Sequence, residues 1–449
     1  MGPGHRQEPT PRGGLRLERL RANASLNALE IQRQFEVEPW RGREDGGGER
    51  EGADLVAAAP RPDATGVSPS SRRRPTRSLA AKPSTQSGDV DRDDLDFERR
   101  RRAWESLTWT LDRAELRNRH PLKIVRSFVR GVLNTDGSEL VTLCESGPLQ
   151  GPQRAIVRDL RNAFFERLAG LLDSGAQAGK VRVCDFDLAA RAVVGLVSWA
   201  PHLSCPQLAL APVSRHRLGE AVEGLVTYGR SLYRSTWVEA PRLDLDQLID
   251  LRRLRCGRRP AQIAREAILI SASRLFNRRG VDETSMQDLG AELSLSEQAL
   301  RDYVGDKPQI VRDCHARAYE VFAFIEDEAA RLGGTAEACD LAVTRAVAEA
   351  YLREDIQPLR PLAGLASLAA QARQIIVIRW RTQSALLHDR HAQGQAEGQM
   401  RTLRADLAPL AGPGAVHWLA AGMVDSDHTR QAHIAEEVAQ FMRLGLAPP

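Results

Sequence analysis

Residues 265–311 read REAILISASRLFNRRGVDETSMQDLGAELSLSEQALRDYVGDKPQIV, and this stretch decides the fold that we expect of the chain. Ile268, Ala272 and Leu275 recur at helical spacing, so they line one face of a helix with a period of 3.6 residues. Gly280 follows two arginines, which is typical of a helix end. The pattern predicts a first helix over about residues 263–279.

Two shorter helices and a longer fourth one are expected next. Thr284 and Gln287 fit a capping box, which places the start of the second helix near Thr284. A tight turn at 293–296 leads into a third helix over about 296–304. Pro308 opens the fourth, since proline is favoured in a first turn. Two short helices joined by a tight turn form a helix-turn-helix, whose later helix fits the major groove of DNA.

This periodicity alone also fits a helical bundle that has no nucleic-acid partner. The order and spacing of the short motifs are more specific: REAIL, then LF, RRG, TSMQDLG, LS and GDK. The stretch resembles the N-terminal domain of the TetR/AcrR family of bacterial transcription regulators. The resemblance implies a cytoplasmic DNA-binding regulator, typically a repressor, with a double-stranded DNA operator and a small-molecule effector as partners.

The composition of the chain is that of a protein with two or three domains. It has 449 residues, 63 basic against 59 acidic side chains, and a net charge of +4. So mild a charge argues against a histone-like binder but allows a local basic patch. The six cysteines are scattered, which disfavours structural zinc and a disulfide scaffold and fits a reducing compartment. We see no apolar run long enough for a bilayer and no signal-peptide pattern, so no membrane partner is expected.

An internal repeat organises the rest of the chain. Over residues 175–199 the sequence aligns without a gap with residues 394–418, at an offset of 219 residues. A second match sets RAWE at 102–105 on RAYE at 317–320. Both halves are therefore predicted to carry the same helical domain, which resembles the TetR-family C-terminal domain. The aligned pairs are Gly175 with Gly394, Gly179 with Gly398, Arg182 with Arg401, Asp187 with Asp406, Gly195 with Gly414 and Trp199 with Trp418.

The expected fold is all-α, with one helix-turn-helix and two TetR C-terminal-like domains. If the halves are homologous, the first should have its own helix-turn-helix at about 46–95, but the Arg- and Pro-rich sequence there has no helical period. Either that domain was lost or the N-terminal residues are not a genuine folded product. The expected parts are a disordered region at 1–95 with a short helix at 15–35, a first helical domain at 96–235, a linker with a basic arm at 236–260, the helix-turn-helix domain at 261–311 and a second helical domain at 312–449.

The basic arm is expected to help hold DNA. Residues 261–310 contain six basic and eight acidic side chains, so the helix-turn-helix unit alone carries −2. The five arginines of the arm, at 252, 253, 255, 258 and 259, bring the total to +3. Since phosphate contacts supply most non-specific affinity, the arm is well placed to reach phosphates or the minor groove.

The third helix departs from the family pattern at the positions that face DNA. Gln298 is suited to adenine, and Arg301 to guanine or a phosphate. Glu297 has a second explanation as a cap, because Ser294 and Glu297 also fit a capping box. The family resemblance implies backbone contacts at Ser285, Tyr303 and Lys307. The predicted DNA-binding residues are Arg255, Arg258, Arg259, Thr284, Ser285, Met286, Ser296, Gln298, Ala299, Arg301, Tyr303 and Lys307.

The resemblance also implies that the last helices dimerise and that the others hold the effector, whose identity the sequence does not reveal. The final helix is predicted over 433–444 and its counterpart over 218–232. The two halves can pair within one chain as a pseudo-dimer, which has one DNA-reading helix-turn-helix (one reader). Alternatively, two chains can form a homodimer with two readers, which suits a palindromic site. Candidate ligand-binding residues are Tyr319, Phe322, Trp380 and Trp418, for which core packing is the commoner explanation.

The competing function is a ligand-binding or protein-interaction regulator that has lost sequence-specific DNA binding. The acidic Glu297 and Asp302 in the reading helix favour it. We find no nucleophile–base arrangement, no glycine-rich phosphate loop and no metal-ligand spacing, so neither an enzyme nor a cofactor is expected.

Overall fold

The computed structural model describes residues 86–134, 140, 143, 149, 151–203, 214–235, 238–257, 259–402, 408–421 and 428–449, with backbone only at 86–93, 255, 408–411 and 428. The helix expected at 15–35 and the disorder expected over 1–85 lie outside the described residues. Residues 86–95, which were also expected to be disordered, form the start of a helix. The described elements are helices, which confirms the all-α class; the one β-type pairing among them is an isolated bridge between Ser231 and Met400. No described helix has both the length and the apolar character needed to cross a membrane.

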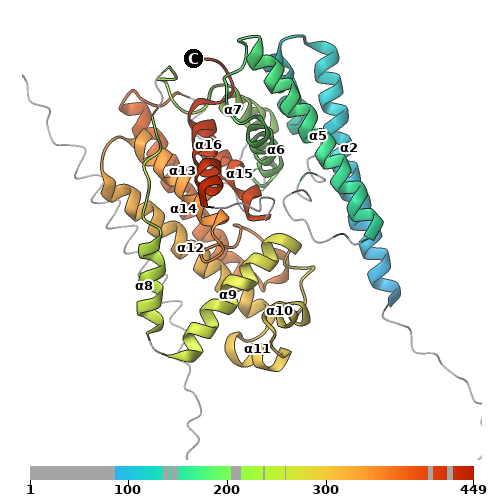
Figure 1. The fold of residues 1–449 in the computed structure, drawn as a ribbon, viewed down its shortest axis with the longest axis vertical. Coiled ribbons are helices and arrows are strands. Elements are labelled where there is room, and N and C mark those ends of the chain that lie inside the picture. Colours follow the sequence, from blue (N-terminus) through green and yellow to red (C-terminus); the bar gives the residue numbers. More distant parts are fainter. Residues whose placement is uncertain are drawn as a thin grey trace, which may run out of the picture. The chain divides into compact units, whose positions relative to one another are not determined.

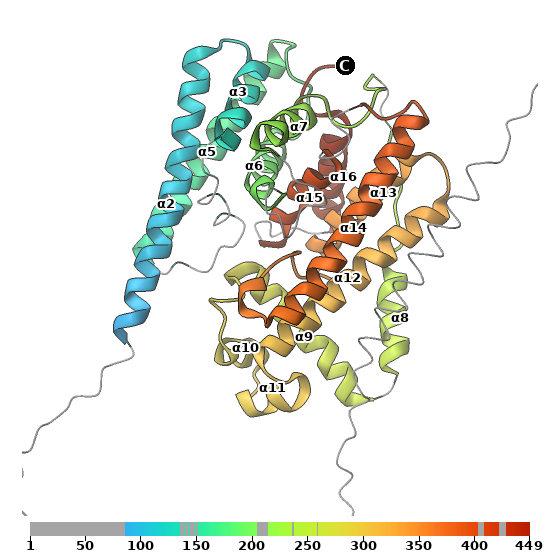
Figure 2. The ribbon, with the colours of Figure 1, turned by 180° about the vertical axis from the view of Figure 1, so that it is seen from behind.

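The first half contains long helices that pack around an aromatic cluster. Trp104 lies with its ring centroid 5.8 Å from that of Phe164 and 5.4 Å from that of Phe165. These rings come from α2 and α5, which lie side by side in Figures 1 and 2. The helices of this half are α2 (Gln86–Arg117), α3 (Pro121–Asn134), α5 (Gly151–Gln177), α6 (Phe186–Leu203) and α7 (Arg215–Tyr228).

The second half begins after four intervening helices and repeats the order of helices seen in the first half. A helix over the linker, α8, precedes the three-helix unit α9, α10 and α11. Helix α12 then runs from this unit into the second half and packs on α13. The bounds are α8 (Asp246–Cys256), α9 (Pro260–Arg279), α10 (Met286–Leu293), α11 (Glu297–Val304), α12 (Lys307–Leu332), α13 (Ala336–Leu352), η1 (Leu365–Ser367), α14 (Ala370–Ala396), α15 (Ala408–His417), η2 (Trp418–Ala421) and α16 (His428–Leu444).

Helices of the two halves correspond in length and position. Helix α5 and helix α14 each have 27 residues, and both their first and their last residues are 219 positions apart. Gly175 packs against the side chain of Val181, and Gly394 packs in the same way against Met400. The two glycines are 219 positions apart in the sequence, and Val181 and Met400 are separated by the same 219 positions. A Cβ atom would not fit at either glycine, so the same close helix–turn contact is built twice.

The two halves meet along α6, α7, α15 and α16, which lie together at the centre of Figure 1. The backbone bonds across this junction are reciprocal. Leu446 donates its N–H to the carbonyl of Val226 at 3.0 Å, and Arg230 donates to Met442 at 3.0 Å. Arg182 donates to Leu446 at 2.8 Å, and Arg401 donates to Arg230 at 2.8 Å. Each half thus uses the same surface to bind the other, as in an isologous interface.

Two glycines bring α6 and α15 into backbone contact. A Cβ atom on Gly195 would collide with the carbonyl oxygen of Gly414 and lie 2.9 Å from Trp418. A Cβ atom on Gly414 would lie 2.6 Å from the Cβ of Trp199 and 2.8 Å from the carbonyl oxygen of Gly195. The repeat-related glycine and tryptophan of each half therefore contact each other across the junction.

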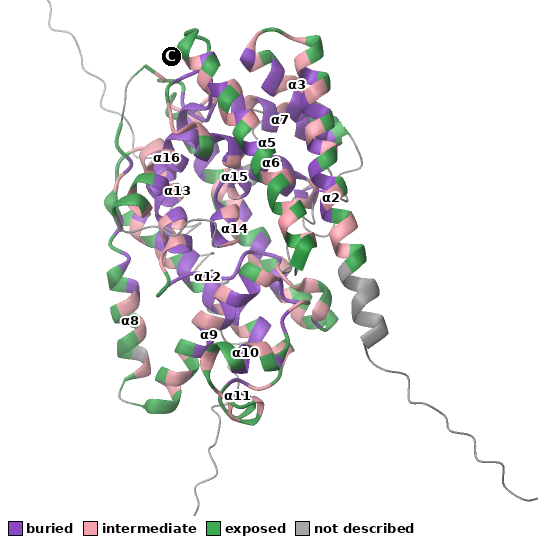
Figure 3. Cartoon of the chain, turned by 45° about the vertical axis from the view of Figure 1, so that its right-hand side comes forward, coloured by how far each residue is buried: buried purple, intermediate pink, exposed green. Residues whose placement is uncertain are grey.

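A buried ion cluster also joins the halves. Arg230, just after α7, donates to the carboxylate of Asp340 in α13 at 2.6 Å, and Arg390 of α14 lies 3.5 Å from the other oxygen. Burial raises the pKa of Asp340, but the two arginines outweigh burial and hold that pKa below its ordinary value. Figure 3 shows buried residues concentrated around α6, α15 and α16, whereas α8 and α11 are largely exposed.

Candidate functional site

Helices α9, α10 and α11 form the expected helix-turn-helix, with α9 as the brace. Phe276 and Ala272 of α9, Leu289 of α10 and Leu300 of α11 are fully buried together. The turn depends on Gly290, because a Cβ atom there would lie 2.6 Å from the carbonyl oxygen of Leu295. This packing fixes α11 at the surface of the unit as a rigid, exposed helix.

The caps of α10 and α11 differ from those expected. Ser285, not Thr284, is the N-cap of α10, and its capping box is completed by Asp288. Thr284 is fully buried and donates its hydroxyl to the carbonyl of Gly280 at 2.7 Å. Ser294 ends α10 in the left-handed region with φ 54°, and Ser296 caps α11. The proposed caps Thr284–Gln287 and Ser294–Glu297 are therefore wrong by one and two residues, because Ser285 and Ser296 have the extended backbone and accept the backbone N–H that defines an N-cap.

The predicted DNA-binding residues divide into an exposed and a buried set. Met286 is 7% exposed and Thr284 is fully buried, so packing accounts for both and takes them out of the candidate interface. Ser285, Ser296, Gln298 and Arg301 are exposed, as is Tyr303, while Ala299 and Lys307 are partly so. The structure thus places six of the twelve predicted residues at least partly exposed at the start of α10 and along α11.

The two residues best suited to contact bases are paired with acids of the same helix. Gln298 donates to Asp302 at 2.9 Å, and Arg301 bonds to Glu297. Glu297 also accepts from Gln287 of α10 at 2.7 Å. Such exposed pairs four residues apart contribute only about 0.3–0.5 kcal/mol each, so DNA can displace them.

The basic arm is only partly available. Arg252 is packed in place, since it donates to Glu266 at 2.7 Å and to the carbonyl of Arg317 at 3.1 Å. Arg259 occupies the N-cap position of α9 and is exposed. The side chains of Arg255 and Arg258 lie outside the described residues. The net charge of +3 counted for the arm and the helix-turn-helix unit included Arg252 as a cation available to phosphates, so that count is too high by one.

The last turn of α9 is attached to the loop that follows α13. Asn277 is buried and donates to the carbonyl of Pro358 at 2.9 Å, while its side-chain oxygen accepts the N–H of Arg360 at 3.0 Å. His315 of α12 contacts the carbonyl of Ala363 in the same loop at 2.8 Å. Leu362 has a positive φ of 68°, which costs energy for a residue with a side chain. The loop 358–363 thus couples the helix-turn-helix to the rest of the second half.

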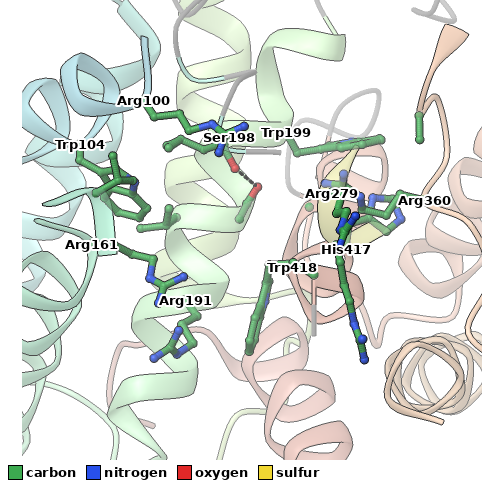
Figure 4. A pocket seen from close by; sticks show the side chains of 18 of the residues that line it. Arg100, Trp104, Arg161, Arg191, Ser198, Trp199, Arg279, Arg360, His417 and Trp418 are labelled. Carbon is green, nitrogen blue, oxygen red and sulfur yellow. Dashed lines mark hydrogen bonds between the residues drawn. The ribbon is translucent and has the colours of Figure 1, made fainter. Parts of the chain in front are cut away.

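A cavity of about 580 Å³ opens beside this loop, between the two halves and the end of α9. Figure 4 shows Arg161 and Arg191 on one side of it, and Arg279 and Arg360 on the other. Helix α5 contributes Arg154, Arg158 and Arg161. The remaining arginines in the described lining are Arg100 and Arg278, and Glu292 is the one carboxylate there.

The interior of the cavity is aromatic and contains polar atoms without a described partner. Trp199 and Trp418 line it from α6 and η2, and the ring of His417 meets Trp199 edge-on at 4.5 Å. The indole N–H of Trp199 and Nδ1 of His417 are both buried and bond to no described group. Burial and the positive charge of Arg360 lower the pKa of His202 to about 4 and that of His417 well below its usual value, so both rings are neutral at pH 7.

Of the predicted ligand-binding residues, Trp418 lines this cavity and the other three are absent from its described lining. Tyr319 and Phe322 pack edge-on at 6.1 Å within the second half, and Trp380 is 2% exposed. The arginines of α5 were not among the predicted residues, although Arg154, Arg158 and Arg161 are spaced four and three residues apart and so share one helix face. Among the described residues no group of three side chains is arranged to hold a metal ion.

Comparison with family models gives a match over residues 122–202, to the tetracyclin repressor-like C-terminal domain. The matched residues run from α3 to α6 of the first half, the part for which a C-terminal-type domain was expected. This match confirms the resemblance to the TetR family. No curated protein matches the sequence.

Several solved structures resemble part of the chain. The TetR family transcriptional regulator PfmR from Thermus thermophilus is 23% identical, with a TM-score of 0.33, over 40% of this chain and 97% of that one. The structure of apo AibR is 20% identical, with a TM-score of 0.34, over 41% of this chain and 99% of that one. A TetR-family transcriptional regulator from Bordetella parapertussis 12822 is 19% identical, with a TM-score of 0.35, over 40% and 95%.

Proposed function

We propose that this chain is a DNA-binding transcriptional regulator of the TetR type, starting from the match of residues 122–202 to the tetracyclin repressor-like C-terminal domain. The observation that supports this function most directly is the helix-turn-helix, in which the Gly290 turn holds α11 with Gln298, Arg301 and Tyr303 exposed. In the proposed role α11 enters the major groove of a double-stranded DNA operator, and Ser285 and Lys307 contact phosphates. The regulator is proposed to act in the cytoplasm as a repressor, released by a small-molecule effector.

We further propose that the two regulatory halves pair within the chain as a pseudo-dimer. The reciprocal backbone bonds across α6, α7, α15 and α16 support this pairing, as does the contact between Gly195 and Gly414. In a TetR-type dimer of two chains these surfaces would lie on separate subunits. Here they cover each other, so one chain presents one reader and is expected to bind one half-site.

The proposed function is tested by selecting bound genomic fragments and then measuring the affinity of one fragment at several salt concentrations. Arg301→Ala is expected to weaken binding about tenfold, within the roughly 1–3 kcal/mol assigned to one bidentate base contact. Arg331→Ala is the matched control, because Arg331 is an exposed arginine of α12 paired with Glu328 and far along the chain from α11. Equal affinity of both variants and the unaltered chain would support the alternative of a regulator without sequence-specific DNA binding.

The assembly is tested on the same fragment by light scattering and footprinting. A monomer that protects one half-site supports the intrachain pseudo-dimer. A dimer that protects a palindrome contradicts the proposed single reader, although it leaves DNA binding intact.

A further inference from the structure

We infer that the cavity between the two halves and the helix-turn-helix binds a small organic anion with an apolar or aromatic body. This inference rests on the proposed regulatory function, for which it names the class of effector and a site. The site lies at the junction of α2, α5 and α6 with α15, η2 and the end of α9, and not among the aromatic residues first considered, Tyr319 and Phe322. Its volume of about 580 Å³ suits a small-molecule ligand.

The charge of the cavity selects an anion. Eight arginines and one carboxylate, that of Glu292, belong to its described lining. Three of the eight arginines pair with acids outside the lining: Arg158 with Asp159, Arg191 with Asp187 and Arg279 with Asp288. The lining is still cationic, and burial followed by the positive charges of Arg191, Arg158 and Arg154 lowers the pKa of Arg161. An anionic occupant reduces this repulsion, and guanidinium groups bind phosphate or carboxylate oxygens bidentately.

The inner wall selects an apolar or aromatic body. Trp104, Trp199 and Trp418 face the cavity together with Phe165. The buried indole N–H of Trp199 and the buried Nδ1 of His417 have no described partner.

The site is connected to the DNA-reading helices through Arg279. This residue lines the cavity from the last turn of α9 and donates to Asp288 at 3.1 Å. Asp288 in turn accepts the N–H of Ser285 at 2.8 Å and so completes the cap of α10. An anion that draws Arg279 away from Asp288 loosens this cap. Loop 358–363, which contributes Arg360 to the cavity and holds Asn277 of α9, is a second connection.

Binding is tested on the full chain without DNA. The first probe is 8-anilinonaphthalene-1-sulfonate, an aromatic anion whose fluorescence rises in apolar surroundings, and inorganic pyrophosphate serves as its competitor. N-phenyl-1-naphthylamine has the same rings without the charge. We expect Arg158→Gln with Arg161→Gln to lower the affinity for the sulfonate at least tenfold and to abolish competition by pyrophosphate. Affinity for the uncharged amine is expected to change less than twofold.

The matched control removes two cations elsewhere, by Arg117→Gln with Lys180→Gln, and is expected to leave both probes unaffected. Circular dichroism melts verify that all variants fold. Absence of sulfonate binding, or equal binding in both double variants, overturns the inference. Loss of DNA affinity in Arg158→Gln with Arg161→Gln, with unchanged sulfonate binding, also overturns it and assigns these arginines to DNA.

Coupling is tested by reciprocity. Pyrophosphate, compared with sodium chloride at equal ionic strength, is expected to lower DNA affinity at least fivefold. DNA must then lower the affinity for pyrophosphate, measured by displacement of the sulfonate, by the same factor. Arg279→Gln is expected to reduce this coupling while the sulfonate still binds. Binding of the probe without any effect on DNA contradicts the effector role and leaves the reader intact. Failure of DNA binding itself, with the probe still bound, contradicts the proposed function instead.

Discussion

The junction between the halves and the surface of α11 are built in opposite ways. The junction is buried, its backbone bonds are reciprocal, and its charged group Asp340 has arginines on two sides. The surface of α11 is exposed, and its polar side chains bond to neighbours on the same helix or on α10. The first arrangement contributes stability, whereas the second leaves side chains that can exchange partners at little cost.

Replacement of Asp340 at the junction is expected to have the largest effect on the free energy of unfolding. Asp340→Asn removes the carboxylate that Arg230 and Arg390 share, and Arg390 keeps only the one of Glu326, so the free energy of unfolding should fall by about 3–5 kcal/mol in urea titrations. Asp250→Asn, at an exposed carboxylate 3.5 Å from Arg253, should change it by less than about 0.5 kcal/mol. Equal effects would contradict the contrast between the two regions.

The same carboxyl predicts a pH dependence. The pKa of Asp340 lies below its ordinary value of 3.8 in the folded chain, so its contribution to stability is complete above about pH 4 and is lost as the pH falls through the folded pKa. Thermal melts between about pH 6 and pH 2 should therefore show a smaller acid-induced decrease for Asp340→Asn than for the unaltered chain. If the melting temperatures of the two proteins fell in parallel with pH, groups other than Asp340 would be responsible for the loss of stability in acid.

Gly195→Ala tests the close approach of α6 and α15. The added methyl group collides with the carbonyl of Gly414, and overpacking of this kind should lower the free energy of unfolding by about 2–3 kcal/mol. Gly170→Ala is the control within a helix, since no atom lies within 4 Å of its Cβ position. It should raise stability by about 0.5–1 kcal/mol, and a loss at Gly170 as large as that at Gly195 would refute the packing explanation.

Ser285→Ala tests the start of α10. Loss of the cap should cost about 1 kcal/mol of stability, while Ser285→Thr should retain most of it because the hydroxyl is kept. Hydrogen exchange of the α10 amides is the more local measurement, and faster exchange confined to the helix-turn-helix is the expected result. Uniformly faster exchange across the junction would indicate that the reader and the junction unfold as one unit.

Glu297→Gln is expected to have the smallest effect. It removes a negative charge from the surface proposed to face DNA and frees Arg301, so DNA affinity should rise about two- to threefold at low salt. Glu105→Gln removes an exposed carboxylate paired with Arg101 on α2 and should leave the affinity unchanged. A decrease in Glu297→Gln would mean that this carboxylate contacts the operator directly.

The helix-turn-helix was predictable from the sequence because its rules are local. Apolar spacing located α9, α10 and α11, and Gly280 and Gly305 ended the helices where expected. The caps were misplaced by one or two residues, since Thr284, Ser285, Ser294 and Ser296 offer the same hydroxyl and the sequence does not show which of them accepts the N–H at a helix start. The cavity was not predictable, because it joins residues from α2 to η2 that periodicity cannot bring together.

Because the contact between Gly195 and Gly414 joins two halves of one chain, amino-acid substitutions can accumulate in one half without occurring in the other. In a symmetric dimer every substitution occurs twice, once in each subunit, so a useful residue on one side is also imposed on the other. Here each position exists once, and the halves already differ where they correspond: at the spacing of 219 residues, Arg158 is matched by Val377 and Arg161 by the buried Trp380. One half can therefore specialise in charge while the other retains an apolar core, which a pair of identical subunits cannot do.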